Sequence, residues 1–113
     1  MKINEIIGDA KTIGIAGHIR PDGDCVGSCM ALYNYLEKNR EDLDVHVYLE
    51  SVDSKFSIIK NADCIDTNGY DGTVFDLFIS LDTASLDRLG QNLPFFANAK
   101  RTACVDHHKS NSG

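Results

Sequence analysis

The chain has 113 residues, a length typical of one domain, and its formal net charge is −6. With 42% hydrophobic and 25% charged residues, the composition is that of an ordinary globular protein, and the acidic balance argues against non-specific binding to long nucleic acid. No apolar run approaches the roughly 20 residues that cross a bilayer, and the N-terminus lacks a signal-peptide pattern. We therefore expect a cytoplasmic protein without a membrane partner.

The spacing of apolar residues predicts strands that alternate with helices along the chain. The expected elements are a short amphipathic helix over 3–10, a strand over 12–17, a helix over 26–39, a strand over 45–49, one or two helical turns over 54–60, a short strand at 64–65, a strand over 77–81, a helical turn up to residue 90, a short helix over 93–98 and a strand over 102–105. Such alternation favours right-handed crossovers and a parallel sheet. We predict the α/β class, with a mostly parallel, Rossmann-like sheet and flanking helices.

The four cysteines are expected to be thiols, mostly buried, because no secretion signal indicates an oxidising compartment. Cys25 and Cys29 are four residues apart and could share a helix face, which leaves a soft metal site as an alternative. Zinc sites normally need four nitrogen or sulfur ligands in recognisable pairs, so this alternative is disfavoured.

Polar clusters directly follow three of the expected strands. Residues 18–24 follow the first strand, Asp82 follows the strand over 77–81, and residues 106–108 follow the last strand. Ligands of open parallel sheets bind beyond the carboxyl ends of the strands. We therefore expect acids and histidines from three strands to converge on one edge of the sheet.

The first cluster combines the imidazole of His18 with the carboxylates of Asp22 and Asp24, a donor set that suits Mn²⁺, Fe²⁺ or Zn²⁺. The Asp-Gly-Asp spacing lets the two carboxylates leave a tight turn in different directions, so that each could hold its own metal. Gly27 and Ser28 are expected to open the following helix, whose free N–H groups and positive dipole end favour a phosphate. The alternative interpretation is a loop followed by an ordinary helix N-cap.

Asp82 taken alone also fits a helix N-cap. Its interpretation as a site residue therefore depends on the other two clusters. Asp76, at the opposite end of the same strand, is expected to be solvated. Two metals about 3.5–4 Å apart at the strand ends would activate a water and stabilise charge on a leaving oxygen.

The third cluster is Asp106-His107-His108. Adjacent histidines after a strand would point in different directions, one toward a metal and one toward substrate, and Asp106 could orient a histidine. A buried structural pair of histidines is the alternative. The isolated His46 is expected to be structural or solvated.

These residues resemble the first three motifs of the DHH phosphoesterase family. The first motif is the pattern His-x-x-Pro-Asp-Gly-Asp-x-x-Gly-Ser over residues 18–28, and Asp82 and residues 106–108 supply the other two. Segments 18–24, 82–90 and 106–111 look closest to the branch that contains bacterial nanoRNases and 3′-phosphoadenosine 5′-phosphate (pAp) phosphatases. The resemblance implies that residues 1–113 are the N-terminal part of a DHH domain, a partial domain that lacks the fourth-motif aspartate and the C-terminal substrate-binding domain.

The resemblance also implies a role for each matching residue. One Mn²⁺ would be held by His18, Asp22 and Asp82, and a second by Asp24, Asp82 and His107, with Mg²⁺ or another divalent ion as the alternative. Asp106 and His108 would be catalytic, Asp106 by supporting the histidines and His108 by contacting the scissile phosphate. The residues expected to contact phosphate or substrate are Arg20, Gly27, Ser28 and His108.

The function implied is Mn²⁺-dependent hydrolysis of short oligoribonucleotides and of pAp, with this chain weak or inactive by itself. Its partners would be a small nucleotide or short oligonucleotide and, as a further expectation, a second copy in a homodimer. Another DHH chemistry is the first alternative: cyclic dinucleotide hydrolysis, single-strand exonuclease action or pyrophosphate hydrolysis. A non-catalytic metal- or nucleotide-binding module is the second.

Overall fold

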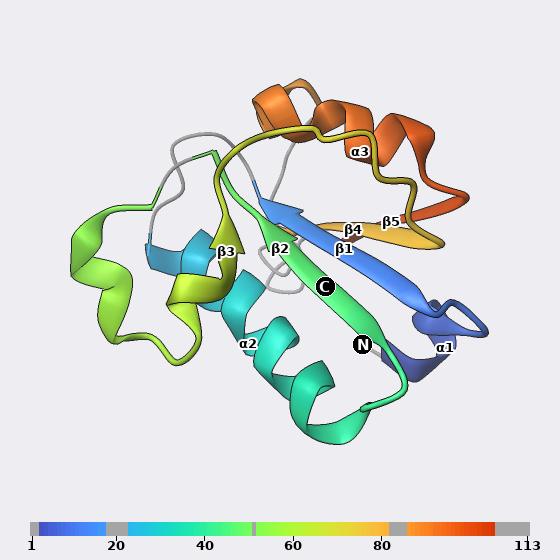
Figure 1. Ribbon diagram of the computed structural model, residues 1–113, viewed down its shortest axis with the longest axis horizontal. Helices are drawn as coiled ribbons and strands as arrows, with labels where there is room; N and C mark the ends of the chain where they lie inside the picture. The colour runs from blue at the N-terminus through green and yellow to red at the C-terminus, as the bar shows by residue number, and fades with distance from the viewer. Residues whose placement is uncertain (1–2, 18–22, 51, 82–85, 106–113) are drawn as a thin grey trace, which may run out of the picture.

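A computed structural model describes residues 3–17, 23–50, 52–81 and 86–105, which form a three-layer α/β arrangement (Figure 1). The described residues contain one five-stranded, all-parallel sheet with strand order β3-β2-β1-β4-β5, which confirms the predicted fold class. The elements are α1 (Ile3–Ile7), β1 (Thr12–Gly17), α2 (Gly23–Asn39), β2 (Asp44–Tyr48), the 3-10 helices η1 (Ser54–Ile58) and η2 (Ala62–Cys64), β3 (Ile65–Asp66), β4 (Leu77–Leu81), the 3-10 segment η3 (Leu86–Asn92), α3 (Leu93–Asn98) and β5 (Arg101–Val105).

The two central strands are apolar because both of their faces are covered. All five residues of β4 are buried, and in β1 only the first residue is partly exposed. Ile15 at the centre of β1 pairs with Val47 of β2 on one side and with Ile79 of β4 on the other. Parallel strands that are buried on both faces read as continuous apolar runs, which explains why these two strands were the clearest in the sequence.

One face of the sheet is covered by α2, with α1 beside it, and the other by α3 (Figure 1). The core on the α2 side is mainly aliphatic, and Val26, Met30 and Leu36 place fully buried side chains there at helical spacing. Burial of such an apolar stripe, rather than intrinsic propensity, supplies most of the stability of a helix of this kind.

The core on the α3 side is aromatic. The ring of Phe95 on α3 stacks on Tyr48 of β2 with centroids 4.1 Å apart, and on Phe78 of β4 at 5.5 Å. Gly14 of β1 makes room for this cluster, since a Cβ there would overlap the Phe78 ring and lie 3.0 Å from Cδ2 of Phe75. Gly14 is therefore fixed by close packing on the α3 face.

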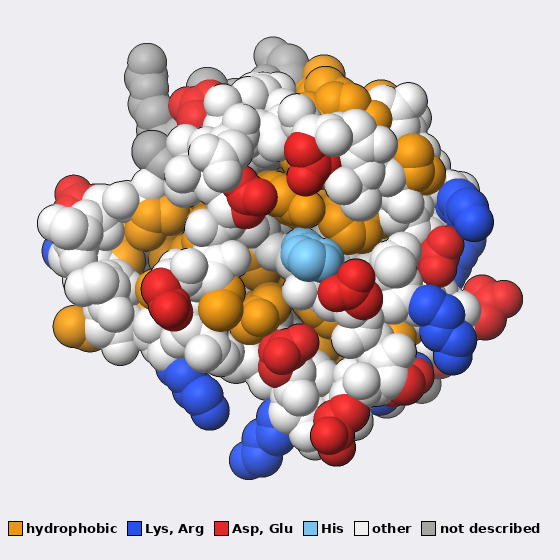
Figure 2. All heavy atoms as spheres, viewed as in Figure 1, with side chains coloured by type: hydrophobic (Ala, Val, Ile, Leu, Met, Phe, Trp, Pro, Cys, Tyr) orange, Lys and Arg blue, Asp and Glu red, His pale blue; other side chains and the backbone are white. Residues whose placement is uncertain are grey.

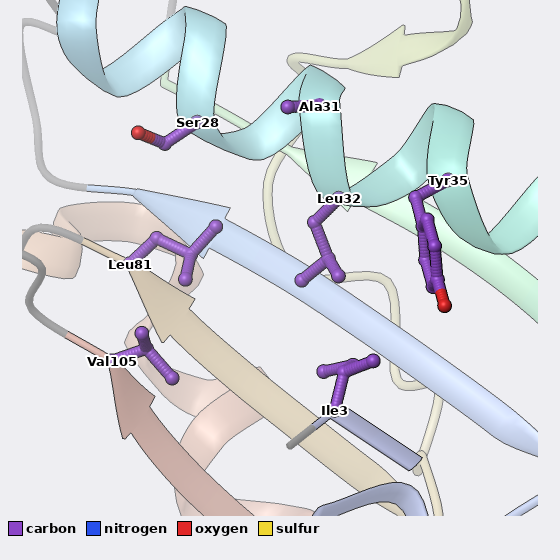
Figure 3. A pocket seen from close by; sticks show the side chains of 7 residues that line it. All are labelled: Ile3, Ser28, Ala31, Leu32, Tyr35, Leu81 and Val105. Atoms are coloured by element: carbon purple, nitrogen blue, oxygen red, sulfur yellow. The ribbon is translucent and has the colours of Figure 1, made fainter. Parts of the chain in front are cut away.

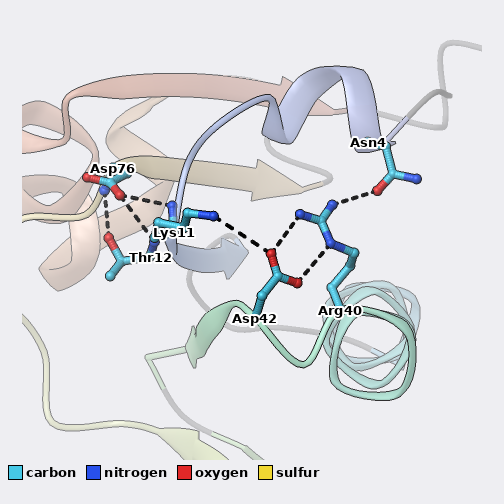
Figure 4. Close-up of polar contacts among 6 residues, drawn as sticks. All are labelled: Asn4, Lys11, Thr12, Arg40, Asp42 and Asp76. Carbon is cyan, nitrogen blue, oxygen red and sulfur yellow. Dashed lines mark hydrogen bonds and ion pairs between the residues drawn. The ribbon is translucent and has the colours of Figure 1, made fainter.

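The amino end of the sheet is held by Asp76, just before β4 (Figure 4). Its carboxylate accepts hydrogen bonds from the backbone N–H groups of Lys11 at 2.9 Å and Thr12 at 3.3 Å, and lies 3.4 Å from the Lys100 ammonium. The Thr12 hydroxyl in turn accepts from the Asp76 N–H at 2.9 Å. These contacts hold the pKa of the Asp76 carboxyl below its usual value. The hydrogen bonds from the two backbone N–H groups are the largest cause. The expectation that Asp76 is solvated holds only in part: its side chain stays 29% exposed, but it also ties the start of β1 to the start of β4.

A second polar contact joins α1 to the turn after α2 (Figure 4). The Arg40 guanidinium donates to both carboxylate oxygens of Asp42 at 3.1 Å and to the side-chain oxygen of Asn4 at 2.9 Å. Asp42 keeps the pKa of Arg40 above its ordinary value, and Arg40 keeps that of Asp42 below its own. The Arg40–Asp42 ion pair lies on the surface, where such pairs contribute little to stability, so its main effect is to fix the conformation of the turn.

The cysteines are thiols, as predicted, but only two of them are buried. Cys25 and Cys29 lie in the core on the α2 side, whereas Cys64 and Cys104 are exposed. None of the helices that the structure describes is long and apolar enough to cross a membrane.

Candidate site at the carboxyl ends of the strands

Three adjacent strands end at the same level. Gly17, the last residue of β1, pairs in register with Leu81, the last residue of β4, and Leu81 pairs with Val105, the last residue of β5. Neighbouring strands lie about 4.8 Å apart, so the ends of β1 and β5 are separated by about 10 Å. Whatever follows these residues leaves the sheet from three adjacent points.

The sequence places all three predicted clusters directly after these residues. Residue 18 follows β1, residue 82 follows β4 and residue 106 follows β5. This is the convergence expected at the carboxyl edge of a parallel sheet. The predicted site side chains themselves lie outside the described part of the structure: His18, Arg20, Asp22, Asp24, Asp82, Asp106, His107 and His108. Their individual roles therefore stay predictions.

The helix that follows the first cluster begins earlier than expected. We expected Gly27 and Ser28 to open it, but α2 starts at Gly23. The first four N–H groups of a helix lack intrahelical partners, and here they precede Gly27. Gly27 and Ser28 therefore do not supply free backbone donors, and that part of the expectation is wrong. A Cβ on Gly27 would meet no described atom within 4 Å outside the helix's own backbone, so this position is open.

An apolar pocket of about 490 Å³ lies between α2 and the sheet, next to the ends of β4 and β5 (Figure 3). Ser28, Leu81 and Val105 are at one end of it and Tyr35 at the other (Figure 3). This pocket was not among the features predicted from the sequence. Its only signal in the sequence is the spacing of 28, 31, 32 and 35, which marks one face of a helix.

The described surface is acidic without forming a metal site of its own. On the face viewed in Figure 2, acidic side chains are scattered around a histidine, and lysines and arginines lie toward the periphery. Among the described residues no three His, Cys, Asp or Glu side chains group closely enough to hold a metal ion. The soft metal site at Cys25 and Cys29 stays a disfavoured alternative.

The environment of His46 agrees with a structural role. Its Nε2 lies 2.9 Å from Oδ1 of Asp44, and its ring contacts Phe75 and Tyr48 with centroids 5.8 and 6.4 Å apart. The side chain is half-exposed on β2, away from the strand ends where the three clusters begin.

The sequence model of the DHH family, N-terminal domain, matches residues 12–113. The chain belongs to the DHH family. The match begins at the first residue of β1 and spans all five strands of the sheet. Membership confirms the resemblance at the level of the family, while the nanoRNase and pAp phosphatase branch stays a prediction.

Comparison with solved structures agrees with this assignment at the level of the fold. The crystal structure of an exopolyphosphatase-related protein from Bacteroides fragilis superposes with a TM-score of 0.77 over 94% of this chain, at 24% sequence identity. The chain spans about a third of that protein's length, 33%. No curated protein sequence matches the chain.

The donor set of the DHH motifs fits divalent metal ions. Imidazole nitrogens and carboxylate oxygens follow three adjacent strand ends, a combination suited to Mn²⁺ and similar ions. Because the strands are held in register by a buried sheet centre, the fold fixes the strand ends from which these predicted ligands follow.

Proposed function

We propose that this DHH chain forms the metal-binding part of a Mn²⁺-dependent phosphoesterase that hydrolyses short oligoribonucleotides and pAp. The observation that carries the proposal is the common level at which β1, β4 and β5 end. Gly17, Leu81 and Val105 are paired in register, and each directly precedes a predicted metal-ligating or catalytic residue. Ligands from three strands then meet without any long loop having to bring them together.

His18, Asp22 and Asp82 hold one ion in this proposal. Asp24, Asp82 and His107 would hold the second, with Asp82 as a ligand shared by both ions. When bound, two divalent ions supply an activated water and offset negative charge on the phosphate. Asp82 suits the bridging position because β4 lies between β1 and β5, the strands that precede the other ligands.

The remaining predicted residues act on the substrate. His108 contacts the scissile phosphate, and Asp106 orients the histidines beside it. Arg20 contributes positive charge to a dianionic nucleotide phosphate. The N-terminus of α2 adds a favourable dipole, because this 17-residue helix starts at Gly23, within the first motif. Ser28 and the open position at Gly27 lie one turn further along, where Ser28 can offer its hydroxyl.

A small substrate agrees with the charge of the chain. The net charge of −6 disfavours electrostatic attraction of a long nucleic acid. A mononucleotide or very short oligonucleotide needs only a compact site at the strand ends. A homodimer is part of the proposal only as an expectation from the sequence.

The test is a substrate panel assayed in the complete protein with Mn²⁺. The panel contains pAp, RNA of two to five nucleotides, a cyclic dinucleotide, single-stranded DNA, pyrophosphate and polyphosphate, the last because of the name of the structural neighbour. Release of mononucleotides from short RNA and of phosphate from pAp is the expected result. Preference for another member of the panel assigns another DHH chemistry, and no turnover of any member would favour a non-catalytic binding module.

The matched control uses the two aspartates that flank β4. Asp82→Asn should abolish turnover, because it removes the bridging carboxylate at the carboxyl end of the strand. Asp76→Asn changes the same residue type at the other end, where it contacts backbone N–H groups, and should leave turnover intact under conditions in which it is folded. Equal loss in both variants would indicate damage to the fold rather than to a site.

A further inference from the structure

Gly17 and Cys25 touch across the base of the first motif. Gly17 ends β1, Cys25 lies in the first turn of α2, and residues 18–24 connect them. A Cβ built on Gly17 would overlap the Cys25 sulfur, so the backbone of the strand lies directly against that side chain. The segment that carries three predicted metal ligands therefore begins and ends at a single packing contact.

The Gly17–Cys25 contact leaves no space for an additional atom. A Cβ on Gly17 would also lie 3.2 Å from Cδ2 of Leu49 and 3.4 Å from Sγ of Cys29. Leu49, Cys25 and Cys29 are all fully buried. Atoms in such an interior have few voids to move into, so a methyl group at position 17 must push the strand end and the helix start apart.

Resting on the proposed metal site, we propose that the Gly17–Cys25 contact is a positioning device for the predicted ligands His18, Asp22 and Asp24. His18 is attached directly to Gly17, and Asp24 directly to Cys25. The distance between Gly17 and Cys25 at this contact therefore sets how far apart the chain positions of His18 and Asp24 can lie. Metal sites tolerate only small errors in ligand position, so a change at the contact is transmitted to metal affinity.

The experiment is a double-mutant cycle on this chain, read by calorimetric Mn²⁺ titration and by the Mn²⁺ electron paramagnetic resonance spectrum. Gly17→Ala should weaken Mn²⁺ binding by about tenfold or more, the scale seen when groups that orient metal ligands are lost. Gly17→Ala combined with Cys25→Ala exchanges a sulfur for a methyl at the same place. It should bring the affinity back to within about threefold of the wild type, since residues in contact are not additive.

A second variant approaches the contact from the helix. Cys25→Val adds volume against Gly17 and should weaken Mn²⁺ binding in the same direction, which keeps the test available if Gly17→Ala does not fold. Gly14→Ala is the matched control, because it introduces the same methyl group in the same strand. Its Cβ would meet the Phe78 ring on the opposite face of the sheet, so it should lower stability without weakening Mn²⁺ binding by the folded chain.

The outcomes separate this inference from the proposed function. Wild-type binding that Gly17→Ala or Cys25→Val leaves unchanged would overturn the positioning role alone. An equal loss in Gly14→Ala, or no recovery in the double variant, would also overturn it, because the effect would then be general destabilisation. No Mn²⁺ binding by the wild-type chain would count against the proposed metal site first, and the positioning role would fall with it.

Discussion

Leu81 and Val105 are paired in register as the last residues of β4 and β5, and both side chains line the pocket beneath α2 (Figure 3). Each is followed directly by an aspartate, Asp82 and Asp106. The pairing means that two motifs separated by more than twenty positions in the sequence leave the sheet as neighbours. Together with Gly17 at the end of β1, it places the residues that precede all three predicted clusters at one level of the sheet.

Asp76→Asn should make the protein less stable at pH 7 than the wild type. The carboxylate accepts two backbone N–H bonds and neighbours Lys100, and these contacts lower its pKa, so its stabilising effect is present above the pKa of the unfolded chain. The effect is lost as the pH falls through the lowered pKa. Urea midpoints of the two proteins should therefore converge from about pH 4 downward. A gap that stays constant down to pH 2 would contradict this role for the charge.

Arg101→Met should loosen α1. The guanidinium donates to the carbonyl oxygens of Ile6 at 3.1 Å and Ile7 at 2.6 Å, at the end of that helix. These are charge-assisted bonds, but Arg101 is exposed, so we expect a loss of only about 1 kcal/mol in the free energy of unfolding. Hydrogen exchange should speed up in α1 more than in β5. Unchanged protection of α1 would show that its apolar contacts alone hold it.

Ser80→Ala should leave the free energy of unfolding unchanged or raise it by up to about 1 kcal/mol. Ser80 is 1% exposed on β4, and its hydroxyl has no hydrogen-bond partner among the described residues. Burying a hydroxyl without a partner is costly, and alanine removes the hydroxyl with almost no change in volume. Chemical denaturation is sufficient to measure the difference. A clear loss of stability would mean that the hydroxyl is satisfied in solution.

Tyr48→Phe should protect the fold at alkaline pH. Burial, and then the negative charge of Asp71 and Asp66, raises the pKa of Tyr48 to about 12. An unfolded tyrosine ionises near pH 10, so the wild type should lose stability relative to the variant between about pH 10 and 12. The stack on Phe95 is kept by phenylalanine. Denaturation curves that run parallel over this range would be inconsistent with a buried neutral phenol.

Much of the fold was predictable because each central strand is a continuous apolar run. The strands at 12–17 and 77–81 were predicted with the bounds that β1 and β4 have. The start of α2 was misplaced because the apolar spacing that indicates the helix begins only at Val26, whereas the helix itself starts three residues earlier, at Gly23.

Relationships between distant segments could not be read from the chain. Asp76 looked like a solvated acid, since its partners Lys11 and Thr12 lie 65 and 64 residues away. The closeness of Gly17 to Cys25 likewise depends on how the helix crosses the strand, and a glycine after an apolar run gives only a faint signal of it. Residue types and spacing were sufficient to identify the motif residues, because they indicate which chemistry a site can perform. The distances between the side chains depend on the fold, which spacing alone does not define.

The most direct test of the metal site is a calorimetric Mn²⁺ titration of this chain beside its Asp82→Asn and Asp76→Asn variants. The proposed site predicts that the wild type binds one or two ions, that Asp82→Asn loses this binding and that Asp76→Asn keeps it. No binding by the wild type, or binding indifferent to Asp82, would contradict the metal centre at the ends of β1, β4 and β5.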